Sequence, residues 1–137
     1  MWAGADLMCD GSAWLETRRQ EFRSAVTHFA SALLAYRLAM GDHWVARHEG
    51  GRDATATSEE RYKRRAAVQD ALYVLELSSD DDQLKKLARD AADAARNIRE
   101  ADTQHEMENR SNDVRNALEK VIAQARVVAP GRDRVKE

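Results

Sequence analysis

Apolar residues recur at alternating spacings of three and four along most of this chain, which is the spacing of an amphipathic α-helix. The clearest run lies between residues 22 and 40, and we call its members the first-helix stripe. They are Phe22, Val26, Phe29, Leu33, Tyr36 and Met40. This spacing turns one face toward a partner helix, as in a bundle or a coiled coil. A helix is therefore predicted from Ser12, a favourable N-cap residue, to about His48, before the stop at Gly50 and Gly51.

A second helix is predicted after a polar loop over residues 50–57. Thr57 and Glu60 have the Thr-x-x-Glu spacing of a capping box, in which side chain and backbone satisfy each other's free groups. The apolar face of this helix includes Val68 and Leu72, and the helix is predicted to end near Leu77.

Two further helices follow. The third is predicted to open at residues 80–82, three aspartates whose carboxylates complement the dipole at a helix N-terminus. Its apolar stripe is rich in alanine, and the helix is predicted to be long, with the next turn at residues 109–112. The fourth carries apolar residues from Val114 to Val128 and ends before Pro130.

Together these segments predict an all-α fold, an antiparallel helical bundle of about four helices with a long first and a long third helix. The 137 residues leave room for one domain with one core. We expect an irregular N-terminal segment over residues 1–11, a single helical domain over 12–130 and a charged tail over 131–137.

Composition and motifs argue against an enzyme. The net charge is −2 and Cys9 is the single cysteine, which excludes a disulfide framework and a cysteine metal site. There is no glycine-rich phosphate loop, and His105-Glu106 lacks the second histidine of a zinc-protease motif because Asn109 stands in its place. We therefore expect no catalytic residues, no metal, no cofactor and no small-molecule substrate.

Two groups of side chains remain as candidate contact sites. The first, a candidate membrane-proximal or partner contact, comprises Trp14, Arg18, Arg19 and Arg23. The second, a basic cluster, comprises Arg61, Lys63, Arg64 and Arg65. Arginines neutralise phosphates, which raises nucleic-acid binding as an alternative. Acidic residues interleave with the basic cluster and no helix-turn-helix spacing is visible, so the pattern does not favour that alternative.

Several stretches resemble a known family. They are Arg19–Arg23 (RQEFR), Phe29–Arg37 (FASALLAYR), Trp44, Ala71–Leu77 (ALYVLEL) and Asp80–Leu84. In these the chain resembles small actinobacterial proteins of the KilB type, which are encoded on conjugative plasmids and related chromosomal elements.

The resemblance covers about residues 15–128 and implies a membrane-associated protein linked to plasmid transfer or spread. Such proteins typically begin with a membrane-spanning helix, followed by arginines and a cytosolic helical region. Trp14 and the arginines after it match the membrane-proximal part, with positive charge on the cytoplasmic side. This sequence departs from the family by showing no such span. The family supplies no catalytic residues.

Our first hypothesis is a non-enzymatic helical interaction module, resembling the cytosolic domain of such a protein. It would be cytoplasmic, at the inner face of the membrane if a native N-terminal anchor is missing from this chain. The alternative is a self-associating structural protein, a homodimer or larger, in which apolar stripes pair between subunits. In either case we expect a protein partner or a second copy of the chain. A nucleic-acid-binding bundle ranks third, and a metal-dependent enzyme last.

Overall fold

The computed structural model describes residues 2–50 and 53–130, and the side chains from residue 11 onward. Within these residues the chain is all-α and contains no β-strand. The helices are α1 (Trp2–Glu49), α2 (Ala54–Ser78), α3 (Asp82–Arg96), the 3-10 helix η1 (Asn97–Glu100) and α4 (Gln104–Val128). The predicted all-α bundle of four α-helices with a long first helix is thereby confirmed. The expected charged tail over 131–137 lies outside the described residues.

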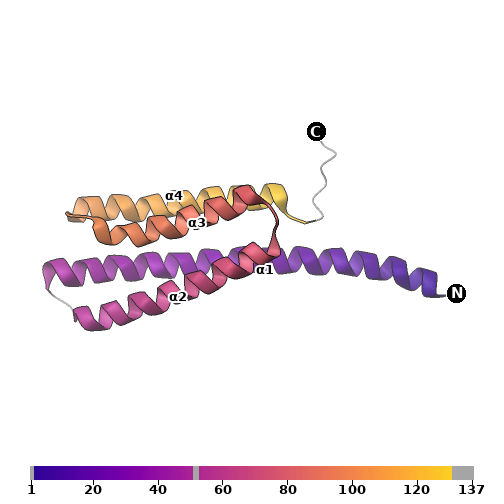
Figure 1. Ribbon diagram of the computed structural model, residues 1–137, viewed down its shortest axis with the longest axis horizontal. Coiled ribbons are helices and arrows are strands. Elements are labelled where there is room, and N and C mark those ends of the chain that lie inside the picture. Colours follow the sequence, from indigo (N-terminus) through magenta and orange to yellow (C-terminus); the bar gives the residue numbers. More distant parts are fainter. Residues whose placement is uncertain (1, 51–52, 131–137) are drawn as a thin grey trace.

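The four α-helices run alternately in opposite directions, with α1 and α2 forming one hairpin and α3 and α4 a second (Figure 1). The central element is α1, which packs most extensively against α2 and also contacts α3, η1 and α4. The α1–α2 and α3–α4 connections lie at one end of the bundle, and the α2–α3 connection lies at the other. At that second end α1 continues well beyond the other three helices.

One hydrophobic core runs through the bundle. Five members of the first-helix stripe are buried in it, and Val26 is partly buried against it. Small side chains line the rest of the buried face of α1 and most of that of α3, which lets neighbouring helices approach closely. The buried alanines of α1 recur every seventh residue, at Ala25, Ala32, Ala39 and Ala46, and those of α3 are Ala88, Ala91 and Ala95. Larger residues of α2 and α4, including Leu75, Val114 and Val121, complete the core.

Glycine residues near both ends of α1 bear on where this helix begins and ends. The helix begins at Trp2, ten residues before the predicted start at Ser12, so residues 2–11 are helical and the irregular segment is not observed there. Gly11 costs a helix interior about 1 kcal/mol relative to alanine, but a single glycine does not stop a helix as proline does. At the other end Gly50 adopts φ 70°, a left-handed conformation that glycine reaches without strain, and α1 ends there.

The start of α2 differs from the prediction. Its N-cap is Asp53, whose Oδ1 accepts a hydrogen bond from the backbone N–H of Thr55 at 2.9 Å. Thr57 already lies within the helix, and the Glu60 carboxylate accepts from Arg64 at 2.6 Å instead of reaching back to the backbone. The predicted capping box at Thr57 is therefore wrong, because an aspartate four residues earlier satisfies the helix start.

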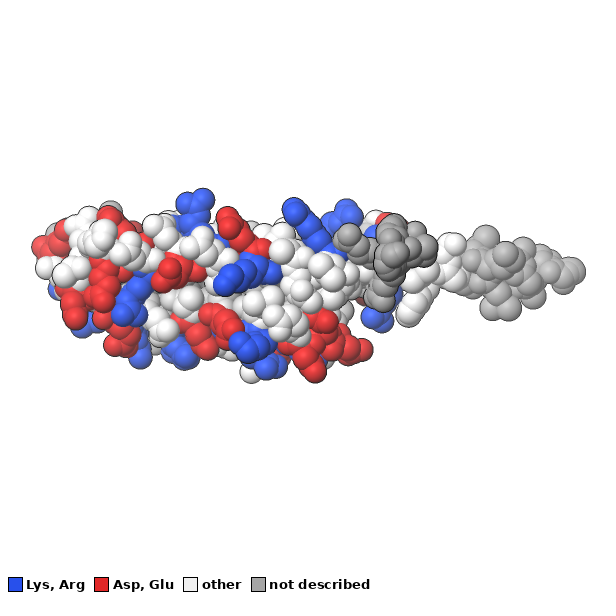
Figure 2. Space-filling view, turned by 90° about the horizontal axis from the view of Figure 1, so that it is seen from above, with Lys and Arg blue, Asp and Glu red and all other residues white. Residues whose placement is uncertain are grey.

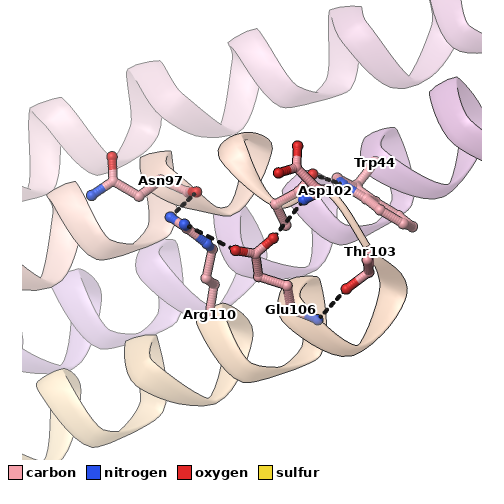
Figure 3. A network of polar contacts seen from close by, with 7 residues as sticks. Trp44, Asn97, Asp102, Thr103, Glu106 and Arg110 are labelled. Carbon is pink, nitrogen blue, oxygen red and sulfur yellow. Dashed lines mark hydrogen bonds and ion pairs between the residues drawn. The ribbon is translucent and has the colours of Figure 1, made fainter.

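The turn between α3 and α4 also lies elsewhere than predicted (Figure 3). The third helix was expected to be long, yet α3 has 15 residues and is the shortest of the four α-helices. Thr103 caps α4 by accepting from the N–H of Glu106 at 3.1 Å, while Glu106 Oε1 accepts from the N–H of Asp102 at 2.7 Å. This capping arrangement starts α4 at Gln104, so residues 109–112, the predicted turn, are helical.

Further hydrogen bonds fix this turn to α1 and α3 (Figure 3). The indole N–H of Trp44 donates to the backbone oxygen of Ala101 at 2.8 Å in a buried setting. Arg110 donates through Nη1 to the backbone oxygen of Asn97 at 3.1 Å and pairs with Glu106 through Nη2 at 3.5 Å. Because a buried carbonyl needs a donor, the indole of Trp44 satisfies Ala101 and links α1 to this turn.

Polar links also close the opposite end of the bundle. Asp81 caps α3 by accepting from the N–H of Leu84 at 2.8 Å, and the same Oδ2 accepts from Gln124 of α4 at 3.0 Å. Arg89 of α3 pairs with Glu76 of α2 at 2.7 Å. The predicted helix opening at residues 80–82 is confirmed, and this end of the bundle is held by side chains from three helices.

Candidate interaction surface

The N-terminal part of α1, Trp2–Arg18, extends beyond the bundle, and we call it the projecting segment (Figure 1). At 1.5 Å per residue it is about 25 Å long. Arg19, the next residue, makes the first hydrogen bond from α1 to a distant part of the chain, with Nε donating to the backbone oxygen of Pro130 at 3.4 Å. Trp14 and Leu15 of the projecting segment are 59% and 42% exposed.

Local contacts order the side chains of this segment. The guanidinium carbon of Arg18 lies 5.2 Å from the ring centroid of Trp14, within the range of a cation–π interaction. Glu16 pairs with Arg19 at 2.7 Å and accepts from Gln20 at 3.1 Å. The structure thus places an exposed indole directly beside positive charge.

The projecting segment continues the face of α1 that is buried within the bundle. Leu15 precedes Leu33 by 18 residues, which is five helical turns, so both side chains leave α1 in the same direction. Leu33 has no exposed surface, whereas Leu15 is 42% exposed. Trp14 stands in the same relation to the buried Ala32. The apolar face of α1 therefore extends past the point where α2, α3 and α4 cover it.

Two grooves border α1 where the projecting segment meets the bundle. One, of about 390 Å³, lies between α1 and the end of α4 and includes Phe22, Val26 and Ile122. The other lies between α1 and the end of α2, beside Val74. Near these grooves the last turns of α2 and α4 expose Leu77 and Val127, and among the described side chains Leu77 is the most exposed large apolar residue at 88%. Apolar surface thus gathers at this end of the molecule.

The residues of the candidate membrane-proximal contact and those of the first-helix stripe lie in different surroundings along α1. Trp14 and Arg18 lie on the projecting segment, Arg19 is half-buried at its base, and Arg23 is exposed and lines the groove beside α4. The first-helix stripe, by contrast, lies in the core of the same chain. Five of its six residues are buried against the other helices of this chain and Val26 is partly buried, whereas Trp14 and Leu15 of the continuing face are exposed.

The basic cluster does not form one surface. Lys63 is exposed, while Arg64 is half-exposed and pairs with Glu60 at 2.6 Å. Arg61 and Arg65 are half-buried on the side of α2 that faces the bundle. On the face seen in Figure 2, basic and acidic residues are also mixed along the bundle. Helical geometry therefore separates the members of this run, and no single-signed field of the kind that binds nucleic acid is visible on that face.

His43 is a polar residue that we did not predict to be buried. Its Nδ1 lies 3.0 Å from Thr57 Oγ1, which links α1 to the first turn of α2. Burial, with the positive charges of Arg61 and Arg47, lowers the pKa of His43. The signal was present in the sequence, because His43 follows Met40 by three residues and so continues the first-helix stripe.

Two kinds of feature are absent from the described residues. Among them there is no group of three or more histidine, cysteine, aspartate or glutamate side chains that could hold a metal ion. In the same part of the chain, no helix is both long enough and apolar enough to cross a membrane.

The fold and surface define an all-helical bundle with one extended, partly apolar helix end. A family model described as KilB plasmid transfer protein matches residues 13–129. The chain belongs to this family, as its sequence resemblance indicated. Comparison with curated proteins and with solved structures found no match.

Proposed function

We propose that this chain is a non-enzymatic interaction module in plasmid transfer, acting at the cytoplasmic face of the membrane through its projecting segment. Family membership supports the process. The observation that carries the interaction is the continuation of a buried helix face into the open, at Trp14 and Leu15. Exposed aromatic and aliphatic side chains that share a face commonly serve as contact anchors.

The side chains beside these anchors support a location at the membrane. Tryptophan is enriched at membrane–water interfaces, and arginines near the surface are attracted to anionic lipids. Arg18 lies against Trp14, and Arg23 is exposed further along the same helix. The projecting segment therefore combines an interfacial aromatic residue with positive charge, which suits a peripheral contact with a negatively charged surface.

A mating assay tests the interaction. A donor strain lacking the gene receives the wild-type chain, Leu15→Ser, or Leu38→Ser as the matched control. Leu38 is 64% exposed on another face of α1, so both variants replace an exposed leucine of the same helix. We expect Leu15→Ser to lower the transfer frequency at least about tenfold and Leu38→Ser to leave it unchanged. Equal transfer by both variants, at equal protein levels, would reject the projecting segment as the contact surface.

Vesicle binding tests the location. We expect the purified chain to sediment with vesicles containing anionic lipid, and Trp14→Ala and Arg18→Gln to weaken this binding. Lys63→Gln serves as the control, because it removes one exposed positive charge from a different helix. Binding that is equally strong to neutral vesicles, or lowered equally by Lys63→Gln, would contradict a specific membrane contact of the projecting segment.

A second candidate function is self-association through the same surface. It is favoured because Leu15 and Trp14 continue the buried face of α1 and are exposed. Two projecting segments that pair side by side would cover both residues in both copies. Light scattering over a concentration series distinguishes it from the first. A dimer that becomes a monomer on Leu15→Ser supports self-association, and a monomer at every concentration excludes it.

A further inference from the structure

Four arginines gather around Tyr36, between α2 and the α3–η1 segment. Tyr36 of α1 is 2% exposed and borders a cavity of about 20 Å³, together with Arg65 and Gln69 of α2 and Arg96 of α3. Tyr36 follows Arg18 by 18 residues, which is about 27 Å along the helix. This cluster is thus separate from the projecting segment, and a ligand bound at the cluster would not depend on the membrane or partner contact.

The cluster carries more positive than negative charge. Arg61, Arg65, Arg96 and Arg99 all lie close enough to Tyr36 to act on it electrostatically. Two carboxylates form ion pairs with two of these arginines. Asp93, which also borders the cavity, pairs with Arg96 at 2.9 Å, and Glu100 pairs with Arg99 at 3.3 Å.

The other two arginines have unused hydrogen-bonding capacity. The Nε of Arg61 is buried and has no hydrogen-bond partner among the described residues, although Nη2 reaches Ser58 Oγ at 3.5 Å. The Arg61 guanidinium also lies 4.4 Å from the ring centroid of Tyr62. The side chain of Arg65 makes no hydrogen bond or ion pair with another residue in the described part of the chain. Buried donors are normally satisfied, so the Nε of Arg61 favours an acceptor from outside the chain. Arg65 is half-buried and borders the cavity, so its donors are available to an acceptor from solution.

We propose that this cluster binds a phosphoryl group. Guanidinium groups match the geometry of phosphoryl oxygens and form strong charge-assisted hydrogen bonds with them. The cavity has room for a single oxygen atom, so one phosphoryl oxygen enters beside Tyr36 and Arg65 while the rest of the group stays at the surface. Burial raises the pKa of Tyr36, so its hydroxyl keeps its proton at neutral pH and serves as a donor.

Titration of the purified full chain with inorganic phosphate tests the site, with binding followed by calorimetry at constant ionic strength. Loss of one charge-assisted donor group weakens binding by roughly one to two orders of magnitude. We expect about this loss for Arg65→Gln and a smaller one for Tyr36→Phe. Lys63→Gln is the control, because it removes one exposed charge from the same helix. We expect it to change affinity less than about twofold.

Two outcomes would overturn the proposal. One is an equal loss of affinity in Arg65→Gln and Lys63→Gln, which would show a diffuse charge effect. The other is phosphate binding no tighter than chloride binding, which would mean that water fills the cavity. Once phosphate binding is established, competition with a single-stranded oligonucleotide and with vesicles containing phosphatidic acid identifies the source of the phosphoryl group. Competition by neither supports a free phosphorylated small molecule.

Discussion

Replacing Leu33 with alanine tests the face of α1 on which both the core and the projecting segment depend. Leu33 has no exposed surface. The substitution removes about three methylene-sized groups, worth about 0.8 kcal/mol each, and leaves a cavity that adds a further cost. The expected loss of unfolding free energy is therefore about 2–5 kcal/mol. For a chain of this size that corresponds to a melting temperature lower by roughly 3–5 °C per kcal/mol.

Urea unfolding followed by circular dichroism measures this loss, with an unchanged urea slope as the sign that only stability has changed. Leu38→Ala is the matched control, because the same atoms are removed from a side chain that is 64% exposed. We expect Leu38→Ala to change stability by less than about 0.5 kcal/mol. A loss below about 1 kcal/mol for Leu33→Ala would refute the assigned face. Leu15 would then no longer be the continuation of a buried face.

Three further predictions concern the turn before α4. Trp44→Phe should cost about 1–3 kcal/mol in thermal unfolding, because the buried carbonyl of Ala101 loses its donor; no loss would show that water replaces the indole. Thr103→Ala should cost about 0.5–2 kcal/mol in urea unfolding through loss of the N-cap, and Thr103→Ser should retain most of it. Hydrogen bonding from the Asp102 N–H lowers the pKa of Glu106. The Glu106 carboxylate therefore stabilises the fold at pH values above its unfolded pKa of about 4.5, and this stabilisation is lost as the pH falls through the lower pKa of the folded state. Glu106→Gln should therefore make stability less dependent on pH below about 5, and an unchanged acid profile would contradict that role.

Much of the fold was predictable because hydrophobic periodicity reports burial directly. Phe29 and Leu33 were predicted to share one face of the first helix, and both are fully buried. The helix boundaries were less predictable, because one motif occurs twice with different outcomes. Thr57 and Glu60 have the capping-box spacing but follow Asp53, which caps α2 first. The same spacing recurs at Thr103 and Glu106, where the Thr103 hydroxyl accepts from the N–H of Glu106 and the motif begins α4.

The candidate surface was predictable only in part. Trp14 and Arg18 stood out from their residue types, but their exposure depends on where α2, α3 and α4 end, which the pattern of α1 does not report. The arginines near Tyr36 were also predictable only in part. Arg61 and Arg65 are neighbours in the chain, whereas Arg96 joins them only through the packing of α3 against the rest of the bundle.

The central claim is that the projecting segment is a contact surface, and amide hydrogen exchange tests it most directly. Exchange of residues 11–18 would be measured for the purified chain alone and with membranes isolated from donor cells. We expect slower exchange of these residues in the presence of the membranes, and no such change for Leu15→Ser. Unchanged exchange of residues 11–18 in the wild-type chain would contradict the claim.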